Sequence, residues 1–337
     1  MPSFYVSDIA DRRRRTFASL ALAIVTLVSA GCGNGPTAPP PPPALTISCP
    51  ANVDVQSSDG SPVFVSFDPP RADGGVAPLT TSCTVQSGLF NVGSTSITCQ
   101  AMDSRNQSAS CNFRVAVRPP PRLQFTRFLA FGDSLTAGEV SFGPTLGVFL
   151  PNESYPSVLQ RRLAAYYRFQ TPVVINVGFG GEEASTGALR FRNDLLQHRP
   201  DAVLLMEGTN DLLDRPDIGR GADSALVALR RMVQDAKSLN VKVGLATVPP
   251  QRAGGVRGRD AVARLIPSFN DRIRALAAEE QVVLIDVYDA MKDNLSLIGV
   301  DDLHPTIMGY DVMAGVFFEA IKKSFEEVPA TTFRERP

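Results

Sequence analysis

The sequence has no tryptophan, only two histidines, and no cysteine after position 111. Aromatic residues make up only 7% of its 337 residues, which argues against a platform of stacked side chains for bases or sugars. The formal net charge is -1, so no general basic field indicates nucleic acid as a partner. Neither histidine is accompanied by a cluster of ligating residues, and we therefore expect no metal and no cofactor.

The N-terminal apolar run, residues 17–30, is shorter than the roughly 20 residues that a comfortable membrane span needs. It follows a basic cluster at 12–15, which is typical of a secretory signal. The tripeptide Ala30-Gly31-Cys32 then resembles the lipobox of bacterial lipoproteins, although Ser29 stands where leucine is usual. We predict that residues 1–32 are a signal peptide, that Cys32 is lipidated, and that the protein is exported and held at the cell envelope by a lipid anchor. The alternatives are a signal anchor, or ordinary secretion with Cys32 as a spare thiol.

Residues 33–44 are rich in proline and are expected to form a stiff, extended linker. Residues 45–118 then show short runs of alternating apolar and polar residues, broken by Gly, Pro and Asp. This pattern predicts a small antiparallel β-sandwich. An even set of cysteines in an exported chain predicts two disulfides. These cysteines are Cys49, Cys83, Cys99 and Cys111.

Four cysteines allow three pairings. We favour Cys49–Cys111 with Cys83–Cys99, because the second pair lies on runs joined by a hairpin-like segment. Over nearly its whole length this segment resembles the HYR module, an immunoglobulin-like family, which implies a role in adhesion or spacing. The blocks that carry the resemblance are Cys49-Pro50, Pro69 to Ala72-Asp73, Gly88-Leu-Phe90-Asn-Val92-Gly93, Ile97-Thr98-Cys99-Gln-Ala101-Met-Asp103 and Cys111-Asn-Phe113-Arg-Val115.

A second proline-rich linker, 119–124, precedes a larger domain that we place at 125–327, with a flexible tail at 328–337. In this domain, continuous apolar runs alternate with longer helical patterns. Strands that are apolar throughout and separated by helices predict a parallel sheet covered on both faces. We therefore expect an α/β three-layer sandwich of flavodoxin-like order with a five-stranded parallel sheet. The five runs are 126–131, 173–177, 202–206, 241–248 and 282–287.

Polar and glycine residues follow these runs, on the rim where α/β folds bind their ligands. Ser134 follows the first run, Gly180 and Gly181 the second, and Asn210 the third, while the stretch 301–305 lies beyond the fifth. Taken alone, Ser134 is explained equally well by turn or cap chemistry, Gly181 and Asn210 are explained better by it, and His304 could be an ordinary surface histidine. Together they supply the residue types that acyl transfer requires.

A serine hydroxyl becomes a nucleophile when a base takes its proton, and His304 is suited to that role. Asp301, three residues earlier, can hold the other ring nitrogen and fix the tautomer. The N–H groups of Ser134 and Gly181 and the side-chain amide of Asn210 can bind the oxyanion. The second histidine, His198, precedes the third run at the opposite edge of the sheet, so we expect a structural role for it.

The larger domain resembles the SGNH, or GDSL-type, serine hydrolase family. The resemblance implies an esterase with Ser134 as nucleophile, Gly181 and Asn210 as oxyanion donors, and Asp301 with His304 completing the triad. Gly180 remains the runner-up for Gly181, because Glu182 follows where Asp is common, and the spacing Asp-x-x-His selects Asp301 over its neighbour Asp302. The four matching blocks are Phe131-Gly132-Asp133-Ser134-Leu135, Asn176-Val-Gly-Phe-Gly-Gly181, Gly208-Thr209-Asn210-Asp211 and Asp301-Asp-Leu-His304-Pro305.

We expect a carboxylic ester substrate: a short acyl ester, an acetylated sugar or a lysophospholipid. The competing hypothesis is a non-enzymatic surface protein that binds its partner through the HYR-like module and keeps the hydrolase fold as a scaffold. The apolar stretch after the nucleophile either forms an acyl site or folds onto the core of the domain. Its candidate residues are Phe142, Leu146, Val148, Phe149 and Leu150.

Overall fold

The computed structural model describes residues 41–213 and 218–327. The chain divides into a unit Met1–Ala44, most of which lies outside the described residues, and a unit Leu45–Pro337. The predicted signal peptide, the predicted lipidation of Cys32, most of the first proline-rich linker and the tail predicted at 328–337 thus lie outside the described residues. Within the described ranges, no helix is both long enough and apolar enough to span a membrane.

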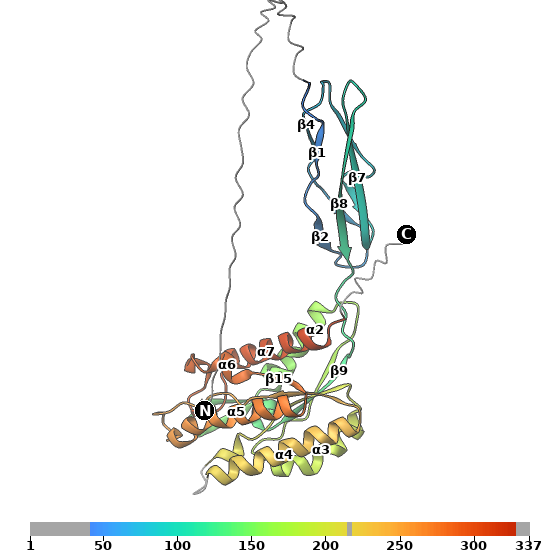
Figure 1. The fold of residues 1–337 in the computed structure, drawn as a ribbon. Helices are drawn as coiled ribbons and strands as arrows, with labels where there is room; N and C mark the ends of the chain where they lie inside the picture. The colour runs from blue at the N-terminus through green and yellow to red at the C-terminus, as the bar shows by residue number, and fades with distance from the viewer. Residues whose placement is uncertain (1–40, 214–217, 328–337) are drawn as a thin grey trace, which may run out of the picture. The chain divides into compact units, whose positions relative to one another are not determined.

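The HYR-like segment is built of β-strands alone (Figure 1). A four-stranded sheet has the order β2-β8-β7-β5, and two further two-stranded sheets pair β1 with β4 and β3 with β6. Valine, isoleucine and phenylalanine side chains from alternate positions fill the space between them, as a half-buried sheet requires. The strands are β1 (Thr46–Ser48), β2 (Val53–Gln56), β3 (Val63–Val65), β4 (Arg71–Asp73), β5 (Thr80–Cys83), β6 (Gly88–Phe90), β7 (Gly93–Met102) and β8 (Ser108–Arg118).

Two disulfides cross-link this small module. Cys49 is bonded to Cys111, and Cys83 to Cys99 on the adjacent strand β7. This is the pairing favoured from the sequence. Its core is small, and cross-links of this kind stabilise such a domain by restricting the unfolded chain.

The larger domain has a five-stranded parallel sheet in the order β12-β9-β13-β14-β15. This is the flavodoxin-like order, and it confirms the predicted fold class. Residues 127–131 show why the strands are apolar throughout: Leu129 and Phe131 pack on one face, and Phe128 and Ala130 pack on the other. The strands are β9 (Arg127–Gly132), β12 (Val173–Asn176), β13 (Ala202–Met206), β14 (Lys242–Ala246) and β15 (Val283–Ile285).

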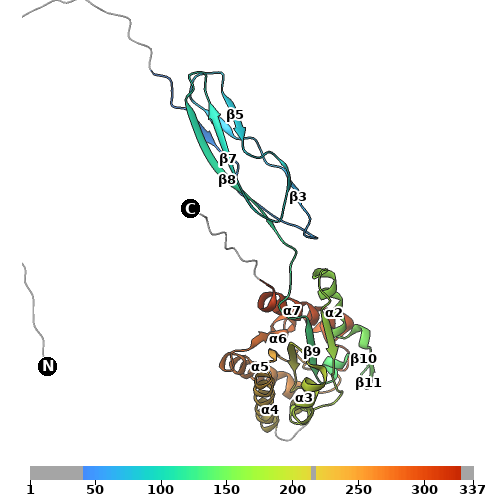
Figure 2. The same cartoon turned by 90° about the vertical axis from the view of Figure 1, so that its right-hand side faces the viewer.

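Helices cover both faces of the sheet. Helices α3, α4 and α5 contribute to one core and α2 and α7 to the other, and Figure 2 shows α2 and α7 across the sheet from α3 and α4. The helices are α1 (Ser134–Ala137), α2 (Tyr155–Tyr166), α3 (Ala184–His198), α4 (Ile218–Ser238), α5 (Asp260–Glu279), α6 (Val287–Met291) and α7 (Ile307–Phe325). Short 3-10 turns occupy Pro151–Glu153, Asn210–Leu212 and Leu295–Leu297.

The apolar stretch after Ser134 forms a β-hairpin of β10 (Glu139–Gly143) and β11 (Leu146–Phe149). The sequence does not predict this hairpin. From the sequence, the stretch is expected either to form an acyl site or to fold onto the core of the domain. Leu150 packs partly against the core. The other four candidates are exposed and therefore do not fold onto the core: Phe142, Leu146, Val148 and Phe149.

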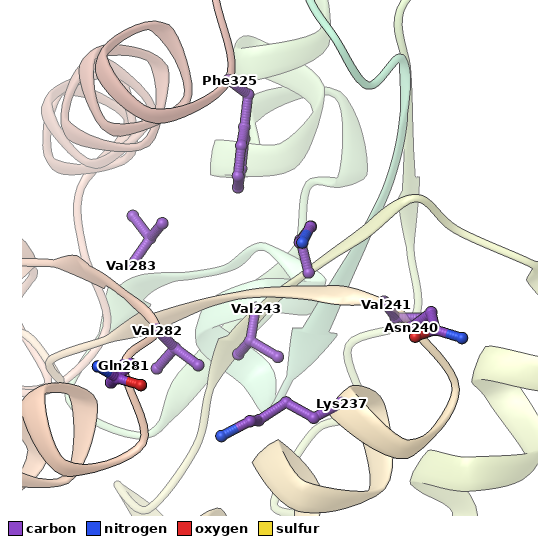
Figure 3. A pocket seen from close by; sticks show the side chains of 9 residues that line it. Lys237, Asn240, Val241, Val243, Gln281, Val282, Val283 and Phe325 are labelled. Carbon is purple, nitrogen blue, oxygen red and sulfur yellow. The ribbon is translucent and has the colours of Figure 1, made fainter.

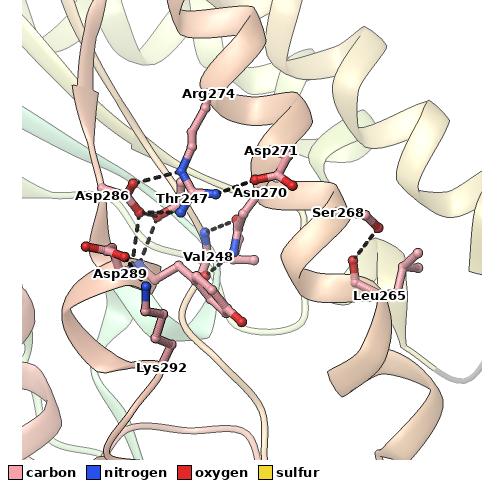
Figure 4. Close-up of polar contacts among 11 residues, drawn as sticks. Thr247, Val248, Leu265, Ser268, Asn270, Asp271, Arg274, Asp286, Asp289 and Lys292 are labelled. Atoms are coloured by element: carbon pink, nitrogen blue, oxygen red, sulfur yellow. Dashed lines mark hydrogen bonds and ion pairs between the residues drawn. The ribbon is translucent and has the colours of Figure 1, made fainter.

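A polar network fixes the chain where it leaves β14 (Figure 4). Asn270 of α5 is fully buried, and its side chain both accepts from the N–H of Val248 and donates to the carbonyl of Val248. Asp286 binds the Thr247 hydroxyl at 3.1 Å and the Arg274 guanidinium at 2.8 Å. Burial alone would raise the pKa of Asp286, but the Arg274 hydrogen bond lowers it. The loop that follows Val248 therefore starts from a rigid point.

Candidate active site

Ser134 lies just after the carboxyl end of β9, which pairs with β12 on one side and β13 on the other, and is the first residue of the short helix α1. Asp133 caps this helix, because its carboxylate accepts from the Leu135 N–H at 2.8 Å. Gly132 is needed at this turn, since a Cβ there would collide with the Thr136 side chain and the Met206 carbonyl. The sequence Gly-Asp-Ser thus brings the chain sharply from strand to helix and fixes the serine at the sheet rim.

His304 and Asp301 lie in the loop between the 3-10 turn Leu295–Leu297 and α7. The Nε2 atom of His304 is 2.9 Å from the Ser134 Oγ, and its Nδ1 atom is 2.6 Å from the Asp301 Oδ2. The other carboxylate oxygen of Asp301 accepts from the N–H groups of His304 and Leu303. Burial works against the ionised carboxylate, but the hydrogen bond and charge of His304 outweigh it and lower the pKa of Asp301 to about 2. An ionised Asp301 can only accept a hydrogen bond, so the proton of the neutral imidazole lies on Nδ1. Nε2 is then free to accept from the serine hydroxyl.

Asp302, the neighbour of Asp301, faces another part of the structure. It accepts from the backbone N–H of Arg257 at 2.8 Å and pairs with the Arg252 guanidinium at 3.3 Å. Its φ of 66° turns the chain so that the two adjacent carboxylates diverge. Asp302 therefore holds the loop after β14, and Asp301 alone contacts the imidazole among the described aspartates.

Asn210 joins the segments that follow β9 and β12. Its side-chain Nδ2 donates to the carbonyl of Glu182 at 2.8 Å and to the Asp133 carboxylate at 3.4 Å. These two partners are the chain neighbours of Gly181 and Ser134. In the described part of the chain, no protein acceptor is found for the backbone N–H of Ser134 or of Gly181. Three hydrogen-bond donors thus gather at one end of the sheet.

The two candidate glycines differ in their surroundings. Gly181 has a φ of 74° and no atom within 4 Å of the position that a Cβ would take. This left-handed region of φ favours glycine. Gly180 lies against the ring of Phe149 from the hairpin. A Cβ on Gly180 would lie only 2.8 Å from the Cζ atom of that ring.

A group of buried carboxyl groups behind the serine was not anticipated from the sequence. Glu182 is neutralised by Arg190, whose Nε lies 2.9 and 3.0 Å from its two oxygens. Glu207 is fully buried, and neither of its oxygens has a hydrogen-bond partner within the ranges that the structure describes. Burial, together with the charges of Asp133, Glu182 and Asp211, raises the pKa of Glu207 well above its usual value. Burial likewise raises the pKa of Asp133 to about 7.

We expect that Glu207→Gln stabilises the protein, and more so as the pH rises. A carboxyl group whose pKa is raised on folding stays protonated in the folded protein while it ionises in the unfolded chain, so it reduces stability increasingly above its unfolded pKa near 4.5. Glutamine removes this penalty. The gain in melting temperature over wild type should be larger at about pH 8 than at about pH 5.

The exposed glutamate of α7, Glu319, provides the control, because Glu319→Gln should change the melting temperature by a similar small amount at both pH values. An equal gain for Glu207→Gln at both pH values would show that Glu207 is not held neutral in the folded protein.

The structure also brings Glu139 of β10 to the imidazole. Its Oε2 lies 3.4 Å from the His304 Nε2. No local pattern in the sequence could have indicated this contact, because it depends on how the unexpected hairpin packs against a loop some 160 residues further on.

Two other features lie away from the carboxyl ends of the strands. A pocket of about 340 Å³ is lined by Lys242, Val243, Val282 and Val283, at the amino ends of β14 and β15 (Figure 3). Ligands of open α/β sheets bind at the carboxyl ends, so this pocket is not the candidate site. His198 ends α3, and its carbonyl accepts from the Arg127 side chain at the start of β9. Across the described ranges, no three His, Cys, Asp or Glu side chains form a group that could hold a metal ion.

Two sequence families match the chain. The HYR domain matches residues 39–117, and the GDSL-like Lipase/Acylhydrolase family matches residues 130–312, more than half of the chain. An acetylxylan esterase of Geobacillus stearothermophilus is 25% identical over 213 residues, which is 58% of this chain and 93% of that protein.

Solved structures are similar as well. A lipase/acylhydrolase from Enterococcus faecalis is 24% identical, with a TM-score of 0.50, covering 60% of this chain and 100% of that one. The structure of an acetylxylan esterase from Geobacillus stearothermophilus is 26% identical, with a TM-score of 0.48, covering 62% of this chain and 99% of that one. With the family match over residues 130–312 and the predicted fold present, this chain belongs to the GDSL-like lipase/acylhydrolase family, preceded by a HYR domain, and is a carboxylic ester hydrolase.

Proposed function

We propose that the chain hydrolyses carboxylic esters through Ser134 as nucleophile, His304 as general base and acid, and Asp301 as the residue that orients His304. The observation that carries the proposal is the unbroken series of contacts from Ser134 Oγ to His304 Nε2, 2.9 Å, and from His304 Nδ1 to Asp301 Oδ2, 2.6 Å. A scaffold that only binds a partner has no need of such an arrangement, which argues against the non-enzymatic alternative.

The reaction follows from these contacts. Nε2 of His304 takes the proton of the Ser134 hydroxyl as Oγ attacks the ester carbonyl carbon, and a tetrahedral intermediate forms. When the intermediate collapses, the carbon–oxygen bond to the alcohol breaks and Nε2 returns the proton to the departing oxygen. Water then attacks the acyl-serine by the same route, which releases the carboxylic acid and restores the Ser134 hydroxyl.

The negative oxygen of the intermediate would be bound by the N–H groups of Ser134 and Gly181 and by Nδ2 of Asn210. The free backbone donors support this assignment, as does the position of Asn210 beside Glu182 and Asp133. The contact from Asn210 to Asp133 is long, 3.4 Å, and an oxyanion is a better acceptor for the same hydrogen.

The proposed substrate is a small acylated compound: a short acyl ester, an acetylated sugar or a lysophospholipid. The acetylxylan esterase among the relatives supports a small acyl group on a carbohydrate, and the exposed hairpin side chains Phe142 and Phe149 offer apolar surface for an acyl chain. The two disulfides of the HYR domain support export. We further propose that Cys32 is lipidated and that the lipid anchors the protein to a membrane.

A test of the oxyanion assignment is Asn210→Ala. We expect kcat for an activated acetyl ester such as p-nitrophenyl acetate to fall about 10²- to 10³-fold with little change in KM, because the lost hydrogen bond strengthens only as charge develops on the oxygen. The exposed Asn152 serves as a matched control, and Asn152→Ala should keep wild-type rates. A kcat within a factor of three of wild type for a folded Asn210→Ala protein would contradict the assignment.

A further inference from the structure

We propose that Glu139 makes the site selective for the charge of the departing alcohol: it favours esters whose alcohol carries a positive charge and disfavours those whose alcohol carries a negative one. The inference rests on the function proposed above, since it concerns the same imidazole. It adds a specificity-determining residue on the side of the site where the alcohol leaves.

The position of Glu139 relative to the reacting atoms supports this role. Its Oε2 is 3.4 Å from His304 Nε2, the same nitrogen that lies 2.9 Å from Ser134 Oγ. In a serine hydrolase, this nitrogen delivers the proton to the leaving oxygen. A group within contact distance of Nε2 is therefore adjacent to the path of the departing alcohol.

Several contacts hold the backbone of β10, and with it Glu139, at this place. The Tyr310 hydroxyl donates to the Glu139 carbonyl at 2.7 Å, and the Asp301 N–H donates to the Ser141 hydroxyl at 3.4 Å, so β10 is tied to the loop that carries His304. The Glu139 side chain lies directly over Gly147 of the paired strand, where a Cβ would collide with its Oε1 atom. The absence of a side chain at position 147 provides the space that the carboxylate occupies.

No lysine or arginine side chain in the described ranges pairs with Glu139. Among the described residues, its only ion-pair contact is with His304. The arginines of the neighbouring loop have other partners: Arg252 binds Asp302, and Arg257 donates to the carbonyl of Pro144 at the hairpin tip. The Glu139 side chain is 22% exposed, so it is accessible to a ligand yet partly shielded from water. Under such conditions, a unit charge several Å away changes a rate constant by roughly three- to tenfold.

The test compares three acetate esters of similar size on the full-length protein: acetylcholine, its neutral isostere 3,3-dimethylbutyl acetate, and the anion 3-sulfopropyl acetate. We expect kcat/KM to fall in that order for wild type. In Glu139→Gln, the ratio of the cationic to the neutral ester should fall about three- to tenfold, and the ratio of the anionic to the neutral ester should rise by a similar factor. About 0.5 M salt should narrow the wild-type spread as well, because it screens the charge.

Two further variants sharpen the test. Glu279→Gln removes the same charge from the exposed end of α5, where Glu279 pairs with Arg230, and should leave all ratios unchanged. Gly147→Ala keeps Glu139 but displaces its carboxylate, and should shift the ratios in the same direction as Glu139→Gln. Gly147 is not among the residues with positive φ, so its backbone accepts alanine.

The outcomes separate the two proposals. If Glu139→Gln lowers kcat/KM equally for all three esters, or leaves their ratios unchanged, charge selection is wrong. The proposed function would still stand, provided that turnover depends on Ser134. Hydrolysis that survives Ser134→Ala would instead overturn the function itself.

Discussion

Ser134→Ala is expected to abolish ester hydrolysis, with kcat reduced on the order of 10⁵- to 10⁶-fold, while the protein stays folded. The hydroxyl has one side-chain partner, His304, and contributes little to the fold. Alanine is a good residue for the first position of α1, where the Asp133 cap remains in place. Rates on p-nitrophenyl acetate give the loss, and thermal unfolding gives the stability.

His304→Gln provides the companion measurement, because residues that act as one unit have similar and non-additive effects. The double variant should be no slower than either single variant. A Ser134→Ala protein that keeps full esterase activity would contradict the proposed mechanism.

Asp301→Asn is expected to lower kcat by about 10⁴-fold with the geometry nearly intact. The backbone N–H groups of Leu303 and His304 still find an acceptor in the asparagine oxygen. The amide nitrogen, however, donates to Nδ1 where the carboxylate accepted, so the proton moves to Nε2 and the imidazole can no longer take the proton of Ser134. The measurement is kcat at saturating ester.

Asp302→Asn is the matched control, because the same change is made one residue away. Asparagine tolerates the φ of 66° at this position, and its oxygen still accepts from the Arg257 N–H. The variant loses the charge and the hydrogen bond that pair with Arg252, neither of which touches His304, and we expect kcat within about tenfold of wild type. Equal losses at the two positions would contradict the assignment of Asp301.

The features that could be predicted from the sequence are those with a local signal. The apolar run 126–131 and the turn residues Gly132-Asp133-Ser134 mark a buried strand and its end, and the structure has β9 at Arg127–Gly132. Asp301 and His304 are three residues apart in one loop, so their contact also depends on local chain geometry. The disulfide Cys83–Cys99 can be predicted for the same reason, because its two cysteines are only 16 residues apart in the chain.

Other features depend on contacts between distant segments and have no such signal. Glu139 follows a glycine after the nucleophile and looks like an ordinary surface residue, yet hairpin packing brings it to His304. Glu207 directly follows a buried strand, where a charged residue is expected to turn to water, but it is fully buried, and the charges of Asp133 and Asp211 contribute to its raised pKa. Burial of this kind depends on the whole sheet and its helices, and a single sequence does not encode it in any one window.

The measurement that tests the central claim most directly is the labelling of the full chain with an active-site phosphonate, followed by peptide mass analysis. The account predicts one adduct per chain, located on Ser134, and no adduct in His304→Gln, because the hydroxyl then lacks its base. A folded protein that forms no adduct, or one labelled at another residue, would contradict Ser134 as the nucleophile.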